Sequence, residues 1–125
     1  MHLSAAAIAR RYAAATGERD VTARQVAERA ATGDRTATAV RQEAVDALAD
    51  GLASAVTLLD PERVVIGGGL ARAGEPYLAP LRESLGARLA FQAMPDLVPA
   101  ELGHEAGCFG AGLLARDLLG AGAAT

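Results

Sequence analysis

Hydrophobic and polar positions follow a helical period over the first half of the chain. Between residues 36 and 59 apolar side chains recur at spacings of three and four, as on one face of an α-helix. They are Val40, Ala44, Val45, Leu48, Leu52, Ala55, Val56 and Leu59. Thr16-Gly17 is a helix stop signal, and Thr22 to Gln25 fits a capping box. The pattern therefore predicts helices at 3–16, 23–32 and 35–59.

The helical period ends at Asp60-Pro61-Glu62, and a short run of β-branched residues, Val64 to Ile66, follows. Such residues favour an extended backbone. No polar residue alternates with them, so both faces of the strand are predicted to be buried, as in a parallel sheet covered by helices. The second half then predicts strand 63–67, helix 75–90, strand 97–102 and helix 104–119. This is a β-α-β-α unit with two parallel strands, followed by a tail at 120–125 that we expect to be disordered.

The predicted fold class is α/β, mostly helical, with residues 1–119 as one folded portion. A sheet of two parallel strands leaves exposed edges and is rarely stable alone. We therefore expect the missing neighbours to come from a larger fold of which this chain is a part, or from another copy of the chain.

Composition narrows the classes of function. The net charge of -3 and the absence of lysine argue against direct contact with nucleic acid and exclude a phosphate loop ending in Gly-Lys-Ser/Thr. The single cysteine, Cys108, cannot form an internal disulfide, which fits a cytoplasmic location. No run reaches the roughly 20 apolar residues of a membrane span, so no membrane partner is expected.

The glycine run that follows the first predicted strand is the main candidate for binding. Gly67, Gly68 and Gly69 permit positive φ angles and let a ligand approach bare main chain. Open α/β sheets bind phosphorylated ligands at the carboxyl ends of their strands. A tight turn that binds no ligand explains the same residues, and spacing alone leaves both interpretations open.

A second group of glycines lies near the last predicted helix. Glycine weakens a helix interior by about 1 kcal/mol relative to alanine, so several together suggest a close approach. Either the helix packs tightly on the sheet, or its start faces the Gly67 to Gly69 turn and the two segments enclose a nucleotide. The residues are Gly103, Gly107, Gly110 and Gly112.

Polar residues near the last helix suggest no further chemistry. His104 and Cys108 have a spacing that can offer two zinc ligands, but nothing else in the chain completes such a site. Glu101 and Glu105 are explained by the favourable field at a helix N-terminus. We therefore predict no metal site and assign no catalytic residue.

Four stretches together resemble the C-terminal half of the ROK family of bacterial sugar kinases and sugar-responsive repressors. They are SAAAIARRY from Ser4, the Gly33-Asp34 step, LDPERVVIGGGLARAG from Leu59 and VPAELGHEAGCFGAGLLA from Val98. The resemblance implies part of an actin-like, ribonuclease-H-type ATPase domain whose triple glycine contacts ATP or ADP. The implied nucleotide contacts are Gly67, Gly68, Gly69, Leu70 and Gly107.

The family kinases also carry an N-terminal phosphate loop, a catalytic aspartate and a His/Cys zinc motif, and none of these occurs in this sequence. The chain is therefore expected to begin just after the zinc motif, to bind nucleotide weakly, to hold no zinc and to be inactive alone. In an intact kinase, ATP with magnesium would phosphorylate a hexose. The effector and dimerisation part of a sugar-responsive repressor, or a truncated non-catalytic protein, are the alternatives. The family further implies a homodimer.

Overall fold

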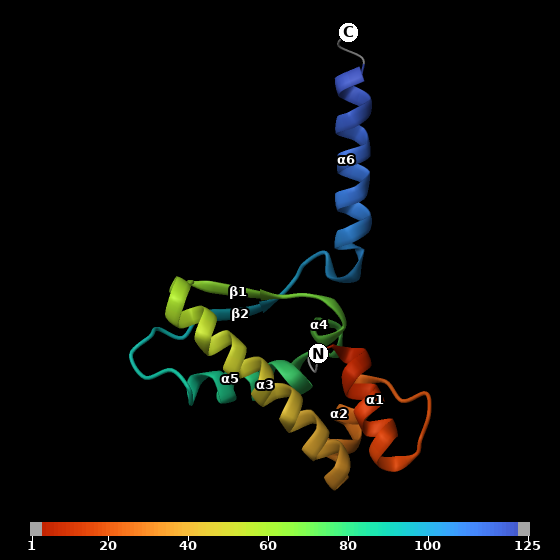
Figure 1. Cartoon of the computed structure of the whole chain (residues 1–125), viewed down its shortest axis with the longest axis vertical. Helices are drawn as coiled ribbons and strands as arrows, with labels where there is room; N and C mark the ends of the chain where they lie inside the picture. The colour runs from red at the N-terminus through yellow and green to blue at the C-terminus, as the bar shows by residue number, and fades with distance from the viewer. Residues whose placement is uncertain (1–3, 123–125) are drawn as a thin grey trace.

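The structure is a computed structural model that describes residues 4–122. Helices α1, α2 and α3 make up the first half, and a strand-helix-strand-helix unit makes up the second (Figure 1). In order the elements are α1 (Ala5–Thr16), α2 (Ala23–Ala31), α3 (Arg35–Leu59), β1 (Arg63–Ile66), α4 (Gly68–Ala73), α5 (Glu75–Gly86), β2 (Asp96–Pro99), the 3-10 helix η1 (Gly103–Glu105) and α6 (Ala106–Gly122).

Side-chain caps fix the starts of the first three helices. The Ser4 hydroxyl accepts a hydrogen bond from the Ala7 amide at 3.1 Å, and an Asp34 carboxylate oxygen accepts one from the Ala37 amide at 2.9 Å. The predicted capping box is confirmed, because Thr22 and Gln25 each accept a hydrogen bond from the backbone amide of the other. Each cap satisfies amide groups that a helix leaves without an internal partner.

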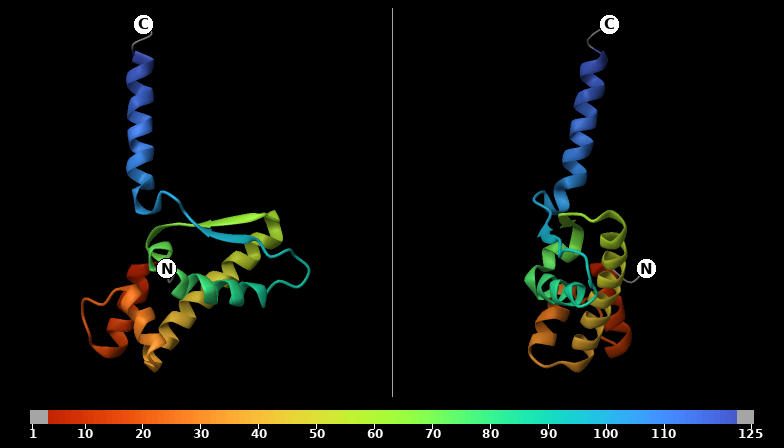
Figure 2. Two further views of the ribbon diagram at one scale, coloured as in Figure 1. Left: turned by 180° about the vertical axis from the view of Figure 1, so that it is seen from behind. Right: turned by 90° about the vertical axis from the view of Figure 1, so that its left-hand side faces the viewer.

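The two strands pair in parallel, with Val64 beside Leu97 and Val65 beside Val98. This confirms the predicted mostly helical α/β fold with two parallel strands. The prediction that both faces of the strand are buried is wrong. Ile66 and Leu97 face the core, whereas Val65 is 61% exposed, because the helices cover one face of the pair only (Figure 2).

The core lies beneath that covered face, where α3 and α5 pack on each other and on α1 and α2. Tyr77 of α5 is its largest fully buried side chain, with 1% of its surface exposed. Its hydroxyl donates a hydrogen bond to the carbonyl of Ala23 at 2.9 Å, across the contact between α5 and α2. Tyr77 therefore satisfies its polar atom while its ring fills the interior.

Burial raises the pKa of Tyr77 to about 12, because the phenolate form would lose its hydration. In the unfolded chain the pKa of Tyr77 lies nearer its ordinary value of 10.0. The neutral phenol therefore contributes stability that is fully present below pH 10 and is lost as the pH rises toward 12. We expect urea midpoints to fall between pH 9.5 and about 11.5, and to fall less in Tyr77→Phe. Equal falls in the two proteins would contradict this prediction.

Several predicted boundaries differ from the structure. The first strand ends at Ile66 rather than 67, the helix from residue 75 ends at Gly86 rather than 90, and the second strand spans 96–99 rather than 97–102. The last helix is preceded by η1 and continues to Gly122, so it includes residues 120–122 of the tail that the sequence predicts to be disordered. Residues 123–125 lie outside the described part of the chain.

One of these boundary differences, the earlier end of α5, has a local cause. At the end of α5 the Arg88 guanidinium donates to the Ser84 carbonyl at 2.9 Å, which satisfies a terminal helix carbonyl and closes the helix. Helix α4 was not predicted, because consecutive glycines have the lowest helix propensity after proline. Leu70 and Ala73 pack on the core, and that packing overrides the propensity.

Helix α6 projects from the body, and its main contact is with η1 (Figures 1 and 2). Large apolar side chains along it are exposed, namely Phe109, Leu113, Leu114, Leu118 and Leu119. Within residues 4–122 no helix combines the length and the hydropathy that crossing a membrane requires.

Candidate functional site

The glycine run lies at the carboxyl end of β1, and its members adopt different backbone conformations. Gly67 is extended, with φ -109° and ψ 179°, and precedes α4 as its N-cap residue. Gly68 has a φ of +72°, which side-chain-bearing residues rarely adopt. Gly69 continues α4. All of them are exposed, so their main chain is open to a ligand from outside.

The fold itself requires glycine at two of these positions. Gly68 is required by its positive φ. At Gly69 a Cβ atom would lie 2.7 Å from the Cβ of Ala5, which is closer than two carbon atoms can pack. Gly69 therefore allows α4 to approach α1. The sequence left open a tight turn that binds no ligand, and the packing of α4 on α1 is a further structural reason for glycine that was not among the alternatives.

Gly67 is different, because nothing in the described fold excludes a side chain there. Its backbone angles suit any residue, and an added Cβ would meet the Ala100 Cβ at 3.9 Å, an ordinary contact. A glycine that the fold does not need, exposed at the carboxyl end of a strand, is the position where close approach of a ligand would matter most.

The second glycine-rich segment begins at the same end of the strand pair. The Ala100 amide donates to the Ile66 carbonyl at 2.8 Å, so the chain leaves β2 beside the glycine run. Gly103 then adopts a φ of +52°, and η1 contacts α4. The structure thus brings 103–105 next to the start of α4. Gly107 lies just beyond, on the first turn of α6, and an added Cβ there would meet no atom within 4 Å.

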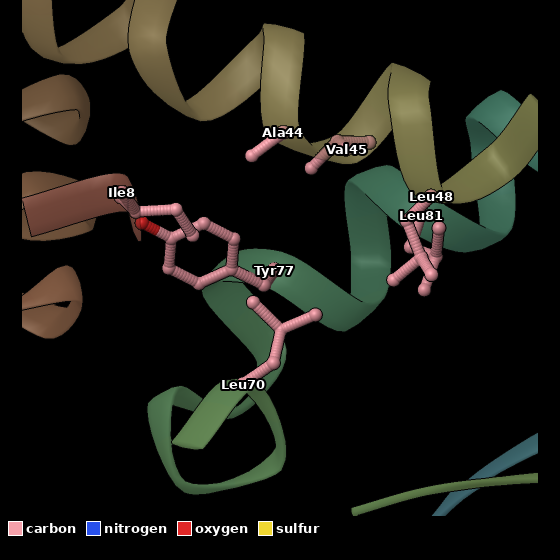
Figure 3. A pocket seen from close by; sticks show the side chains of 7 residues that line it. All are labelled: Ile8, Ala44, Val45, Leu48, Leu70, Tyr77 and Leu81. Atoms are coloured by element: carbon pink, nitrogen blue, oxygen red, sulfur yellow. The ribbon is translucent and has the colours of Figure 1, made fainter. Parts of the chain in front are cut away.

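Leu70, the remaining predicted contact, directs its side chain inward. Figure 3 shows it pointing toward Tyr77 beneath α3, and with Ile8 and Leu81 it borders an apolar cavity of about 10 Å³. A cavity of that volume is at the lower limit for one water molecule and cannot hold a nucleotide. The half-buried Leu70 side chain therefore packs mainly toward the core, and its main chain is the part that we consider for a ligand contact.

A second, larger hollow of about 320 Å³ borders Gly69. It is lined by Ala5, Thr22, Ala23, Arg24, Gly69, Arg72 and Ala73. The two guanidinium groups make its surroundings positive, although Arg24 is paired with Glu28 at 3.0 Å. Arg72 lies in the stretch from Leu59 to Gly74 that resembles the family, but no binding role is predicted for it, and Arg24 lies in none of those stretches. Only packing of α1, α2 and α4 brings them together, so the sequence carried no signal for this hollow.

Two hydrogen-bond networks that join the helices contain the carboxylates whose pKa values are shifted most clearly. The pKa of Asp34 is lowered first by the hydrogen bond that Tyr12 donates at 2.5 Å, and next by the Ala37 amide. The pKa of Asp46 is lowered first by the Ser84 hydroxyl, at 2.7 Å. These charged carboxylates connect α1 to α3 and α3 to α5. They are structural partners rather than acids or bases poised for catalysis.

The prediction about His104 and Cys108 remains untested, because the His104 side chain lies outside the described part of the structure. Cys108 is exposed on α6. Among the described residues no group of three or more His, Cys, Asp or Glu side chains is placed to hold a metal ion.

Sequence comparison gives the chain a family context. The model of the ROK family matches residues 1–118. The chain is 36% identical over 83 residues to a glucokinase of Thermotoga maritima, and the match covers 65% of this chain and 26% of that protein. It is 42% identical over 93 residues to the bifunctional enzyme NanE/NanK of Brucella melitensis, covering 74% of this chain and 18% of that enzyme.

Solved structures agree with the sequence matches. The ROK hexokinase of Thermus thermophilus is 35% identical, with a TM-score of 0.73, and the match covers 90% of this chain and 39% of that one. A ROK glucokinase of Streptomyces griseus, solved with glucose and AMPPNP, is 29% identical with a TM-score of 0.74 over 93% of this chain and 43% of that one. This chain thus spans less than half the length of these relatives. Its fold is that of part of an actin-like ROK domain, and the chain belongs to the ROK family.

Proposed function

We propose that this chain is the nucleotide-side portion of a ROK sugar kinase resembling glucokinase. The main chain of Gly67, Gly68, Gly69 and Leu70 contacts the adenosine part of ATP or ADP, and the segment from Gly103 to Gly107 forms the neighbouring wall. The observation that carries the proposal is the open Gly67, which the fold does not require to be glycine. It lies at the end of the sheet where α/β folds bind phosphorylated ligands.

The relatives support a kinase over a repressor. Those named above are called glucokinase, hexokinase or a NanE/NanK enzyme, and the Streptomyces griseus glucokinase was solved with a nucleotide analogue and glucose. In an intact kinase a hexose hydroxyl oxygen attacks the γ-phosphorus of ATP, ADP leaves, and the hydroxyl proton passes to a base.

In this proposal the chain supplies only part of the active site of such a kinase. Its exposed glycine main chain fits one wall of a nucleotide site. The described residues offer no cluster of acidic side chains for Mg²⁺, and we assign none to this chain. Catalysis, sugar binding, homodimerisation and a cytoplasmic location remain predictions that follow from the resemblance to intact ROK kinases.

Substitution of Gly67 by alanine tests the nucleotide proposal. The added methyl group should block close approach of the nucleotide and weaken ADP binding by at least about tenfold, equivalent to ~1.4 kcal/mol. The fold should be unaffected, because the methyl group meets only Ala100 at a normal distance. Titration of ¹⁵N-labelled protein with ADP measures the affinity and shows whether the amide signals of 67–70 and 103–107 shift.

Gly51→Ala is the matched control. Gly51 is an exposed glycine in α3 with no atom within 4 Å of an added Cβ, and it is remote from the glycine run in sequence. This variant should bind ADP like the unaltered chain. Equal ADP affinities for Gly67→Ala and Gly51→Ala, or shifts confined to other parts of the chain, would refute the assigned nucleotide contacts.

A further inference from the structure

The hollow beside Gly69 lies where α4 contacts both α1 and α2 (Figure 1). Its volume of about 320 Å³ is at the lower end of the range for small-molecule sites. Most of its wall consists of residues with a single methyl group or no side chain, namely Ala5, Ala23, Gly69 and Ala73. Because no large side chain fills the space between these helices, the hollow is open to a small ligand.

Two arginines supply the charge of this hollow, and no acidic side chain lines it. Arg72 is exposed and forms no ion pair with any residue in the described part of the chain. Arg24 is paired with Glu28, but only through its Nε atom, at 3.0 Å. The chain as a whole has a net charge of -3. Two guanidinium groups at a hollow without a carboxylate therefore indicate an anionic ligand.

The backbone around the hollow is held in place by contacts already described. The Ala23 carbonyl accepts the hydrogen bond from the buried Tyr77 hydroxyl, at 2.9 Å. The capping box at Thr22 fixes the start of α2, and the close approach of Gly69 to Ala5 fixes α4 against α1. A ligand would therefore have to order only the two arginine side chains, which keeps the entropic cost of binding low.

The charge of the site favours phosphate over carboxylate. A guanidinium group is planar, and its N–H donors match the oxygen atoms of either anion. A phosphate monoester carries a charge of about -1.5 to -2 at pH 7, which two guanidinium groups can neutralise, whereas a carboxylate carries only one negative charge. We propose that this hollow binds the phosphate group of a small phosphorylated molecule through Arg72 and Arg24. The proposal does not rest on the nucleotide contacts, since neither Gly67 nor Gly68 lines the hollow.

Titration of the ¹⁵N-labelled full chain with inorganic phosphate, at pH 7.5 and constant ionic strength, tests the proposal. The amide signals of 22–24, 69 and 72–73 should shift and saturate with a dissociation constant in the millimolar range. Acetate, which presents a single carboxylate, should bind at least about tenfold more weakly. Arg72→Gln should weaken phosphate binding by at least about tenfold, because it removes the charge-assisted hydrogen bonds.

Arg35→Gln is the matched control for loss of one positive charge. Arg35 is an exposed arginine at the start of α3, forms no ion pair with the described residues and does not line the hollow. This variant should bind phosphate like the unaltered chain. Both arginine variants should keep the melting temperature of the unaltered chain, because changes at exposed positions have little effect on stability.

Glu28→Gln gives a test in the opposite direction. It releases Arg24 from its ion pair, so phosphate should bind about two- to fivefold more tightly, in proportion to the strength of an exposed salt bridge. Glu43→Gln removes the partner of Arg11, neither of which lines the hollow, and should leave the affinity nearly unchanged. A purely structural role of Arg24 predicts no such gain. Equal affinities of the two glutamate variants would contradict a contact between Arg24 and the phosphate.

Other outcomes would overturn the proposal as a whole. These are phosphate shifts that do not saturate or that lie outside the hollow, equal losses in Arg72→Gln and Arg35→Gln, and acetate binding as tight as that of phosphate. Gly67→Ala distinguishes this site from the proposed nucleotide contacts, because it should weaken ADP binding without weakening phosphate binding. If Gly67→Ala weakened phosphate binding as much as Arg72→Gln, the anion would lie at the glycine run and the separate site would be refuted.

Discussion

Replacing Tyr77 with alanine is expected to lower the free energy of unfolding by about 3–5 kcal/mol, the usual cost of truncating a buried aromatic side chain. The side chain is 1% exposed, and its ring borders a small cavity together with Ile8 and Leu70. Truncation would enlarge that cavity and would also remove the donor to the Ala23 carbonyl. Small domains are stable by roughly 5–15 kcal/mol, so a substantial fraction of the variant could unfold. Urea denaturation followed by circular dichroism measures the change.

The Tyr77→Phe variant distinguishes the contribution of the aromatic ring to stability from that of the hydroxyl. It keeps the packing and leaves the Ala23 carbonyl without its donor, which should cost about 1 kcal/mol. If the alanine and phenylalanine variants were equally destabilised, the hydroxyl would be the main contribution and the packing argument would be wrong. If neither were destabilised, Tyr77 would not be the centre of the core.

The elements with strong local signals could be predicted from the sequence. Helix 35–59 was predicted with the bounds that α3 has, because its apolar period is long and Asp34 caps it. The capping box at Thr22 was also found, since both of its members lie within one turn of the chain. Signals of this kind depend on neighbours in sequence and need no knowledge of the fold.

Features set by distant contacts were missed. Exposure of Val65 depends on what covers the sheet, and three apolar residues in a row carry no information about that. Helix α4 forms despite the low helix propensity of its glycines, because Leu70 packs on the core. The different roles of the three glycines at 67–69 also become visible only in the folded structure. The residue that leaves no room for a side chain at Gly69 is Ala5, which is far away in sequence.

Gly69→Ala is expected to destabilise the chain by about 1–3 kcal/mol, which is typical of overpacking. The new methyl group would lie 2.7 Å from the Ala5 Cβ, whereas carbon atoms pack at about 3.5–4.0 Å. Neither methyl group can rotate away, because each is attached directly to a helix backbone, so α4 and α1 must move apart. Alanine's better helix propensity offsets up to about 1 kcal/mol of this cost. Chemical denaturation of the variant gives the net value.

Ala5→Gly provides the decisive comparison, because it removes the atom with which the new methyl group collides. In the double variant the cost of Gly69→Ala should largely disappear, giving a coupling energy of about 0.5–3 kcal/mol between the two sites. Gly51→Ala, in open space on α3, should instead stabilise the chain by up to about 1 kcal/mol. Additive effects of the changes at positions 5 and 69 would mean that α1 and α4 do not meet there. Gly69 would then have no structural role at that contact, and the argument that distinguishes it from Gly67 would fail.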